Sequence, residues 1–403
     1  MPVISLDMIQ TISLAVLVLL LGKFLVNKFP VLQKYCIPTP VVGGLVFAIV
    51  ALILRQTNVL AIEFDTTLQD VAMNAFFTSV GFGASIKVLK KGGKKVIVFL
   101  GAAVGLVVLQ DVLGVGLAST LGLHPYIGLA TGSVPMTGGH GTAAAFGPVL
   151  EEAGAAGANT IAIAAATFGL VSGSMMGGPV ANRLIIKYNL TSKKENDFKA
   201  TKELEEIATA VEEAPKPLIE NNFFIAAFEL LIAMGIGTIF SMLFESLNFT
   251  LPGYIGAMIV GIIIRNIGEF TGKIPVPMEE IDVLGGIGLQ LFLSMALMGL
   301  RLWELAELAL QMIILVFAQA LLMYLYANFI TFRMSGKDYD AAVLTAGHCG
   351  FGLGATPNGV ANMTSVTEKW GPSPTAFFVL PIVGGMFIDF INAFIITIFM
   401  NIV

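Results

Sequence analysis

Two glycine-rich stretches limit how this chain can fold. Residues 133–142 read SVPMTGGHGT, and residues 346–358 read AGHCGFGLGATPN. Glycine weakens a helix, and Pro135 and Pro357 have no backbone N–H to donate, so we expect neither stretch to continue as a regular helix. Apolar segments flank both stretches. Whether such interruptions are tolerated therefore depends on the environment in which the surrounding chain folds.

The composition around these stretches indicates a membrane protein. The chain has 403 residues, of which 56% are hydrophobic and only 12% charged, and its mean hydropathy is +0.87. Soluble domains carry about a quarter charged residues. The net charge of -5 gives no clustered basic surface for nucleic acid. Only Cys36, Cys349 and three histidines are present, so we predict no disulfide framework and no metalloenzyme site.

Apolar segments of spanning length recur along the whole chain. A spanning helix needs about 20 mostly apolar residues to cross a hydrocarbon core of about 30 Å. Ten segments fit: 6–25, 38–54, 71–86, 96–117, 161–184, 223–244, 252–264, 283–300, 308–330 and 375–398. The sequence therefore predicts an all-α polytopic membrane protein.

The distribution of basic residues predicts a topology. Lys and Arg are enriched in cytoplasmic loops. With the N-terminus outside, only Arg55 and Arg301 of the 22 Lys and Arg lie outside. That assignment works only if residues 126–149 and 339–363 each enter and leave the membrane on one side. We therefore predict a re-entrant hairpin at each glycine-rich stretch, and both chain termini outside.

A polar segment divides the chain into halves. Residues 187–220 contain 14 charged residues and the sequence APKP at 214–217, which predicts a cytoplasmic linker without a catalytic role. We assign residues 1–186 to a first membrane repeat and residues 221–403 to a second.

The halves match one another at an offset of about 212–215 residues. The coinciding positions include Ser79 with Ser294, Tyr126 with Tyr339, Gly139 with Gly352, and Gly141 with Gly354. Because each half has five spans, the second half starts on the opposite side. The sequence thus predicts an inverted-topology repeat, each half with five transmembrane helices and one re-entrant hairpin, as in many transporters. Gene duplication in a structural bundle explains the similarity, but not two matching polar breaks.

The hairpin tips are the predicted binding site. Half-helix N-termini offer free N–H groups to a carboxylate, while unwound carbonyls and hydroxyls can replace the water around a sodium ion. The candidate substrate-binding residues are Ser133, Thr137, Gly138, Gly139, His140, Gly141, Gly352, Gly354, Thr356, Asn358 and Asp389. The candidate sodium ligands are Ser133, Thr142, Thr356 and Asp389. The alternative reading is that the glycines serve close helix packing.

The ionisable residues of the spans have alternative roles. Asp389 could hold a substrate ammonium or a cation, or pair with a neighbouring helix. His140 and His348 could carry a proton or contact substrate, or be neutral and bonded to a backbone carbonyl. Asp111 and Glu229 also interrupt apolar runs and are weaker candidates.

Several functional classes lack their motifs in this sequence. The sequence has no convincing P-loop, G-x-S-x-G elbow, H-E-x-x-H motif or paired-carboxylate arrangement. We therefore predict neither an enzyme nor a cofactor. Transport would therefore be driven by an ion gradient. A gated channel with re-entrant loops as its selectivity filter remains an alternative.

Three motifs resemble those of the bacterial glutamate:sodium symporter family. They are GGHGT at 138–142, MALMGLRLWEL at 295–305 and AGHCGFGLGATPNGVANM at 346–363, and the resemblance covers nearly the whole chain. One departure is Phe351, which stands where the family's GGxG pattern has its first glycine.

The resemblance implies a function. It suggests a homodimer in the bacterial inner membrane that couples inward glutamate movement to sodium in an elevator-like cycle, where a substrate-carrying unit moves past a fixed scaffold. Its partners would be glutamate, sodium and the lipid bilayer. A sodium-coupled dicarboxylate or citrate carrier is the alternative within transporters, because anion selectivity depends on loop geometry.

Overall fold

Long helices occupy all ten predicted spans. The computed structural model describes residues 1–192, 218–246 and 252–403, without the side chains of residues 245 and 304–308. Within these residues ten helical segments are long and apolar enough to cross a membrane, which confirms the all-α polytopic class. Their principal helices are α1 (Met8–Lys28), α3 (Thr39–Gln56), α4 (Thr67–Gly83), α6 (Gly93–Thr120), α10 (Ala158–Tyr188), α12 (Glu220–Ser246), α13 (Gly253–Thr271), α14 (Met278–Met298), α15 (Leu305–Tyr326) and α20 (Ile388–Ile402).

Shorter elements connect or continue these helices. They are α2 (Pro30–Lys34), α5 (Ile86–Lys91), α7 (Pro125–Leu129), α8 (Ser133–Met136), α9 (Gly139–Glu152), α16 (Phe332–Met334), α17 (Tyr339–Gly352), α18 (Thr356–Trp370), α19 (Pro374–Ile382), the 3-10 turn η2 (Leu302–Glu304) and the π-helical turns η3 (Ala327–Thr331) and η4 (Val383–Phe387). The last predicted span is therefore built from α19, η4 and α20 in succession.

Local sequence explains several helix ends. Asp7 caps α1 through a reciprocal capping box with Gln10, and Asp338 caps α17 by accepting a hydrogen bond from the Ala341 N–H. At the other end of a helix, Gly272 follows α13 with a φ of 66°, a left-handed conformation that glycine adopts without strain.

One small sheet departs from the all-helical expectation. Strands β1 (Val3–Leu6) and β2 (Ala61–Phe64) pair in parallel, with Val3 opposite Ala61. The first predicted span therefore begins at Met8 rather than at residue 6, because residues 3–6 pair with the backbone of strand β2, more than 50 residues further along the chain.

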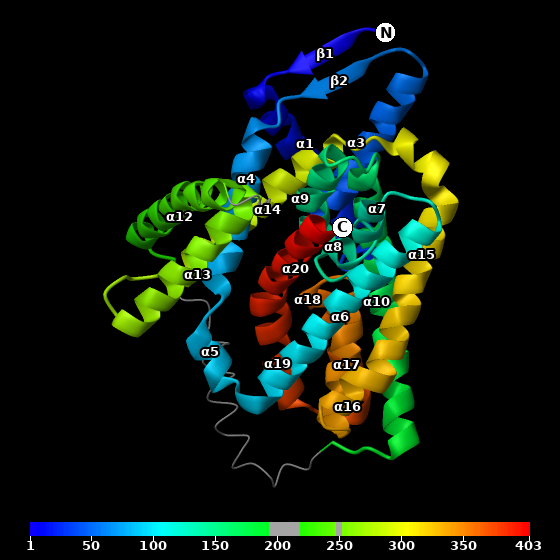
Figure 1. Ribbon diagram of the computed structural model, residues 1–403, viewed down its shortest axis with the longest axis vertical. Helices are drawn as coiled ribbons and strands as arrows, with labels where there is room; N and C mark the ends of the chain where they lie inside the picture. Colours follow the sequence, from blue (N-terminus) through cyan, green and yellow to red (C-terminus); the bar gives the residue numbers. More distant parts are fainter. Residues whose placement is uncertain (193–217, 247–251) are drawn as a thin grey trace.

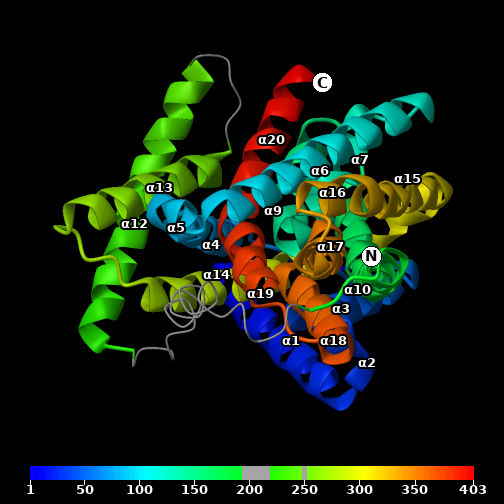
Figure 2. The ribbon, with the colours of Figure 1, turned by 90° about the horizontal axis from the view of Figure 1, so that it is seen from below.

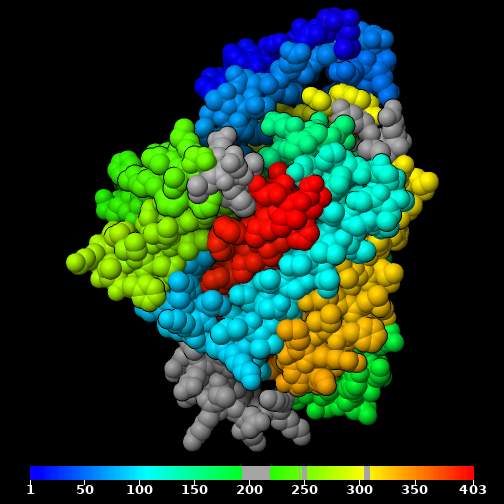
Figure 3. Space-filling model, in the orientation of Figure 1, coloured from blue at the N-terminus to red at the C-terminus, as the bar shows by residue number. Residues whose placement is uncertain are grey.

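The helices form two bodies, each drawn from both halves of the sequence (Figures 1 and 2). The six-helix body comprises α1, α3, α4, α12, α13 and α14, which pack mainly on one another. The broken-helix body comprises α6–α10 and α15–α20, including the short helices of both glycine-rich stretches. In Figure 1, α12 and α13 form the left edge and α10 and α15 the right. Figure 3 shows α20 at the surface between α6 and α13.

Most of the predicted linker lies outside the described residues. Of the range 187–220, the structure describes residues 187–192 and 218–220. Lys187 belongs to the last turn of α10, and Glu220 is the first residue of α12. The assignment of the linker to the cytoplasm stays a prediction.

Candidate functional site

Each glycine-rich stretch contains a short break between helices. The first break is residues 137–138, between α8 and α9, and the second is residues 353–355, between α17 and α18. The breaks are short, because residues 139–142 and 346–352 are helical. Close packing explains how the helix continues through a glycine here. A Cβ on Gly350 would lie 2.5 Å from the Cα of Gly359, so glycine lets α17 and α18 approach each other.

The helices that flank the breaks are short. α9 and α17 have 14 residues each and α18 has 15. A helix of 14 residues is about 21 Å long at a rise of 1.5 Å per residue. A hydrocarbon core of about 30 Å exceeds that length, so none of these helices alone would cross it.

The two breaks meet in space although more than 200 residues separate them in sequence. Gly139 has a φ of 63°, and a Cβ there would lie 2.7 Å from the carbonyl oxygen of Gly354. The hydroxyl of Thr137 lies 3.5 Å from the carbonyl oxygen of Gly352. Glycine is required at position 139 by both its backbone conformation and this contact.

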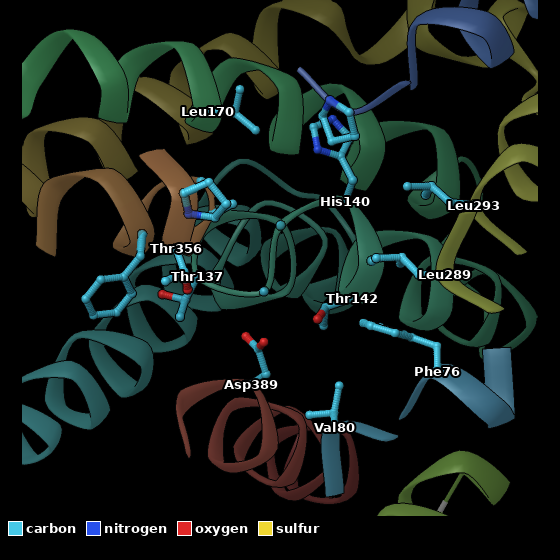
Figure 4. A pocket seen from close by; sticks show the side chains of 18 of the residues that line it. Phe76, Val80, Thr137, His140, Thr142, Leu170, Leu289, Leu293, Thr356 and Asp389 are labelled. Carbon is cyan, nitrogen blue, oxygen red and sulfur yellow. The ribbon is translucent and has the colours of Figure 1, made fainter. Parts of the chain in front are cut away.

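A cavity of about 490 Å³ lies where the breaks face the six-helix body (Figure 4). The broken-helix body contributes its polar lining, which includes Thr137, His140, Thr142, Thr356 and Asp389. The six-helix body contributes a mostly apolar wall: Pro38, Thr39, Pro40, Phe76, Phe77, Val80, Leu289, Gln290 and Leu293. The cavity therefore lies between the two bodies, with most of its polar groups on the broken-helix side.

Nine of the predicted site residues line this one cavity. They are Thr137, Gly138, Gly139, His140, Gly141, Thr142, Gly354, Thr356 and Asp389. The structure thus brings residues of both glycine-rich stretches together with the carboxylate of α20. In Figure 4 the Asp389 side chain points into the pocket, toward the breaks.

Ser133, Gly352 and Asn358 do not line the cavity but lie behind its wall. The Ser133 N–H and hydroxyl donate to the Asp111 carboxylate, at 2.8 and 2.9 Å. The Asn358 side chain donates to the Leu170 carbonyl and to a serine hydroxyl on α10. These groups are occupied in holding the broken helices in place.

The cavity combines anion-binding and cation-binding groups. α9 and α18 both begin at it, and neither N-cap residue, Gly138 or Ala355, makes a side-chain hydrogen bond to its helix. Helix N-termini attract carboxylates through free N–H groups and the helix dipole. No Lys or Arg lines the cavity among the described residues. The Asp389 carboxylate and the threonine hydroxyls supply oxygen atoms for a cation.

Both buried histidines bond to threonine. His140 Nε2 lies 3.0 Å from the Thr167 hydroxyl, and His348 Nδ1 lies 2.8 Å from the Thr331 hydroxyl. The alternative prediction, a neutral histidine bonded to a backbone carbonyl, was therefore wrong about the bonding partner. The Thr167 hydroxyl donates to the Ile163 carbonyl at 3.1 Å, so it accepts from His140, whose proton is on Nε2. Only His140 lines the cavity.

The two weaker carboxylate candidates have different surroundings. Asp111 is fully buried and, as described, bonded to the first turn of α8. Glu229 is partly buried on α12, and its Oε2 has no hydrogen-bond partner within the described part of the chain. Neither residue lines the cavity.

Comparison with known proteins agrees with this geometry. The sequence pattern of the sodium/glutamate symporter family matches residues 4–372. The sodium/glutamate symporter of Escherichia coli strain K12 is 45% identical over 401 residues, which covers 98% of each chain. That of Shigella flexneri is equally similar, and that of Haemophilus influenzae is 44% identical over 392 residues and 95% of each chain. The chain belongs to the sodium/glutamate symporter family.

Membership of the sodium/glutamate symporter family confirms the resemblance found in the motifs. It also confirms that the protein belongs among transporters rather than enzymes, with sodium as the coupling ion of the family. The match is nearly full-length, so it includes both bodies and the cavity between them.

Sequence reasoning missed the apolar wall of the site and the polar residue behind it. Phe76, Val80, Leu289 and Leu293 of this family member lie in ordinary apolar runs, which carry no signal of a binding surface. Gln110 did carry a signal, since it is a polar residue beside Asp111 within an apolar span. Its side chain bonds to Thr137 in the first break and to Gly352 at the edge of the second.

We predict that Gly139→Ala strongly reduces transport by this symporter family member. A methyl group would force the residue out of its left-handed conformation, at about 1–2 kcal/mol, and would clash with the Gly354 carbonyl. Transport of purified variants in proteoliposomes measures the effect. Gly178→Ala is the matched control, because a Cβ at Gly178 meets nothing within 4 Å. Equal transport by both variants would contradict the close contact between the breaks.

Proposed function

We propose that this protein is a secondary active transporter that carries glutamate into the cell together with sodium. The observation that carries the proposal is its 45% identity, over 98% of its length, to a curated sodium/glutamate symporter. The cavity supports the assignment chemically. Glutamate has two carboxylates and one ammonium, and helix N-termini together with Asp389 complement both kinds of charge.

Charge explains why the two ligands would move together. Glutamate and Asp389 are both negative, so their joint burial in a low-dielectric cavity is costly without a cation. Sodium supplies the missing positive charge. The N-termini of α9 and α18 add about half a positive charge each. With them included, the cavity is close to neutral when glutamate and one sodium are both bound, whereas glutamate alone leaves a net negative charge and sodium alone a net positive one. This difference favours movement only with both ligands bound.

The proposal includes an inverted repeat with one re-entrant hairpin per half. Helix packing supports it. Gly22 of α1 packs closely on Gly43 of α3, and Gly237 of α12 packs on Gly256 of α13, about 212–215 residues further along. Likewise α3 packs on α14 as α13 packs on α4. The halves 1–186 and 221–403 would be the repeats, with both chain termini outside the bacterial inner membrane.

An elevator-like movement fits the two bodies. The wall that the six-helix body contributes is apolar apart from Thr39 and Gln290, while the other polar side chains of the cavity belong to the broken-helix body. An apolar wall can slide past a loaded site without breaking hydrogen bonds or ion pairs. The broken-helix body would therefore carry the ligands, and the six-helix body would form the stationary scaffold.

The first test is uptake of labelled glutamate into proteoliposomes that contain the purified protein. We expect an inward sodium gradient to drive uptake and its collapse to abolish accumulation. Uptake without sodium would contradict the coupling. Stronger inhibition by unlabelled malate or citrate than by unlabelled glutamate would favour the alternative, a sodium-coupled dicarboxylate or citrate carrier.

The cation-binding groups can be tested by conservative substitutions. Asp389→Asn, Thr142→Val and Thr356→Val keep the side-chain size but remove a charge or hydroxyl from the cavity. We expect each to raise the sodium concentration for half-maximal uptake. Glu368 and Thr364 lie on the exposed surface of α18, so Glu368→Gln and Thr364→Val serve as controls. An unchanged sodium requirement in all three cavity variants would remove these residues from the ion site.

The family resemblance also suggests a homodimer, which would join two six-helix bodies and leave the broken-helix bodies free to move. Support comes from α12 at the edge of the molecule, whose outer face exposes Phe224, Phe228, Leu231 and Ile239. Light scattering of the purified protein in detergent measures its mass. We expect two chains per particle, and a monomer at every concentration would contradict the proposal.

A further inference from the structure

A single side chain behind the cavity bonds to the first helix break and to the last residue before the second. Gln110 lies in the middle of α6 and is fully buried. Its Nε2 donates to the Gly352 carbonyl at 2.7 Å, and its Oε1 accepts from the Thr137 hydroxyl at 2.7 Å. Gly352 is the last residue of α17, so its carbonyl lacks a partner within the helix. The Gln110 amide therefore joins the second break to the first.

These bonds fix which way the amide and the hydroxyl point. The Gly352 carbonyl can only accept a hydrogen bond, so the amide nitrogen of Gln110 must face it. The amide oxygen then faces Thr137, and that oxygen can also only accept. The Thr137 hydroxyl must therefore donate its one proton to Gln110. The lone pairs of the same hydroxyl are left for any further partner.

Neighbouring cavity groups show the same polarity. The Thr356 hydroxyl donates to the Gly384 carbonyl at 2.5 Å, so its oxygen too can only accept from a ligand. Figure 4 shows Thr137, Thr356 and Asp389 on the same side of the pocket, away from His140. This side of the cavity presents oxygen lone pairs and a carboxylate, the groups that a cation requires.

We propose that Gln110 is a positioning residue that binds the two breaks together and sets the Thr137 hydroxyl as an acceptor, so that Thr137 holds a cation rather than a carboxylate. The cation is either sodium or the ammonium group of the substrate, which share this chemistry. The inference rests on the proposed function of the cavity. In it, Thr137 binds a positively charged group, whereas the helix N-termini bind carboxylates.

The surroundings of Gln110 suit a fixed orientation. Gln319 on α15 donates to the Gln110 backbone carbonyl at 2.8 Å, and the adjacent Asp111 binds the first turn of α8. All three side chains are buried and none lines the cavity. Polar residues inside a membrane protein are retained where they have a function or a partner, and here the partners are the two breaks.

The test measures sodium dependence and cation discrimination in the full-length protein reconstituted in proteoliposomes. The variants are Gln110→Met, which keeps the side-chain length without either hydrogen bond, and Thr137→Val, Thr137→Ser and the double variant Gln110→Met/Thr137→Val. Each is assayed for half-saturating sodium at saturating glutamate. Each is also assayed for competition by glutarate, which lacks the ammonium group of glutamate.

We expect Gln110→Met and Thr137→Val each to raise the sodium concentration for half-maximal uptake about tenfold, which is the effect of losing one buried polar contact. The double variant should be no worse than the poorer single variant, because the two residues act through one bond. Thr137→Ser should keep the wild-type value. A second result also supports the proposal. If Gln110→Met and Thr137→Val keep the wild-type sodium dependence, but glutarate competes with uptake by these variants as well as unlabelled glutamate does, then Thr137 binds the ammonium group.

A control separates positioning from general loss of packing. Tyr326→Phe removes another buried bond between α15 and α6, the 2.8 Å bond to the Ala102 carbonyl, and should leave half-saturating sodium unchanged. Wild-type sodium dependence and wild-type glutarate discrimination in Thr137→Val would overturn the proposal. So would additive effects in the double variant. Failure of the wild-type protein to show sodium-dependent glutamate uptake would instead reject the proposed function itself.

Discussion

Backbone amides and carbonyls inside a membrane must find partners within the protein, and the rest of this structure depends on that requirement. The two helix breaks meet it by mutual burial. A Cβ on Gly169 of α10 would lie 2.3 Å from the Leu353 carbonyl, so α10 passes close against the second break. Gln110 completes the arrangement by accepting from one break and donating to the other. Enclosed in this way, irregular backbone becomes usable as a binding surface.

The same requirement explains how polar groups are divided between the two bodies. The broken-helix body holds the backbone breaks, Asp389 and the hydroxyls of Thr137, Thr142 and Thr356. The six-helix body faces the cavity mainly with Phe76, Val80 and Leu289. Apart from Thr39 and Gln290, the hydrogen-bonding and charged side chains available to a ligand at the breaks therefore belong to one body. Such a division is what a moving carrier next to a fixed support would need.

Much of the fold could be predicted from the sequence, because hydropathy is a local property. All ten spans were found, and the two breaks lie within the predicted glycine-rich stretches. The sequence did not predict how short the breaks are. Glycine has low helix propensity, but at Gly350 the missing side chain lets α17 pack against the backbone of α18, so the helix continues through this position.

The sequence by itself determined which segments are apolar enough to span, where their helices are interrupted, and which residue types could hold an acidic substrate and a cation. Only the tertiary structure decided that Asp389 and Thr137 face the cavity while Ser133 and Asn358 lie behind it. The physical reason is the distance along the chain between bonded partners. Gln110 and Gly352 are 242 residues apart, and no local pattern records which of many buried polar groups will meet across such a separation.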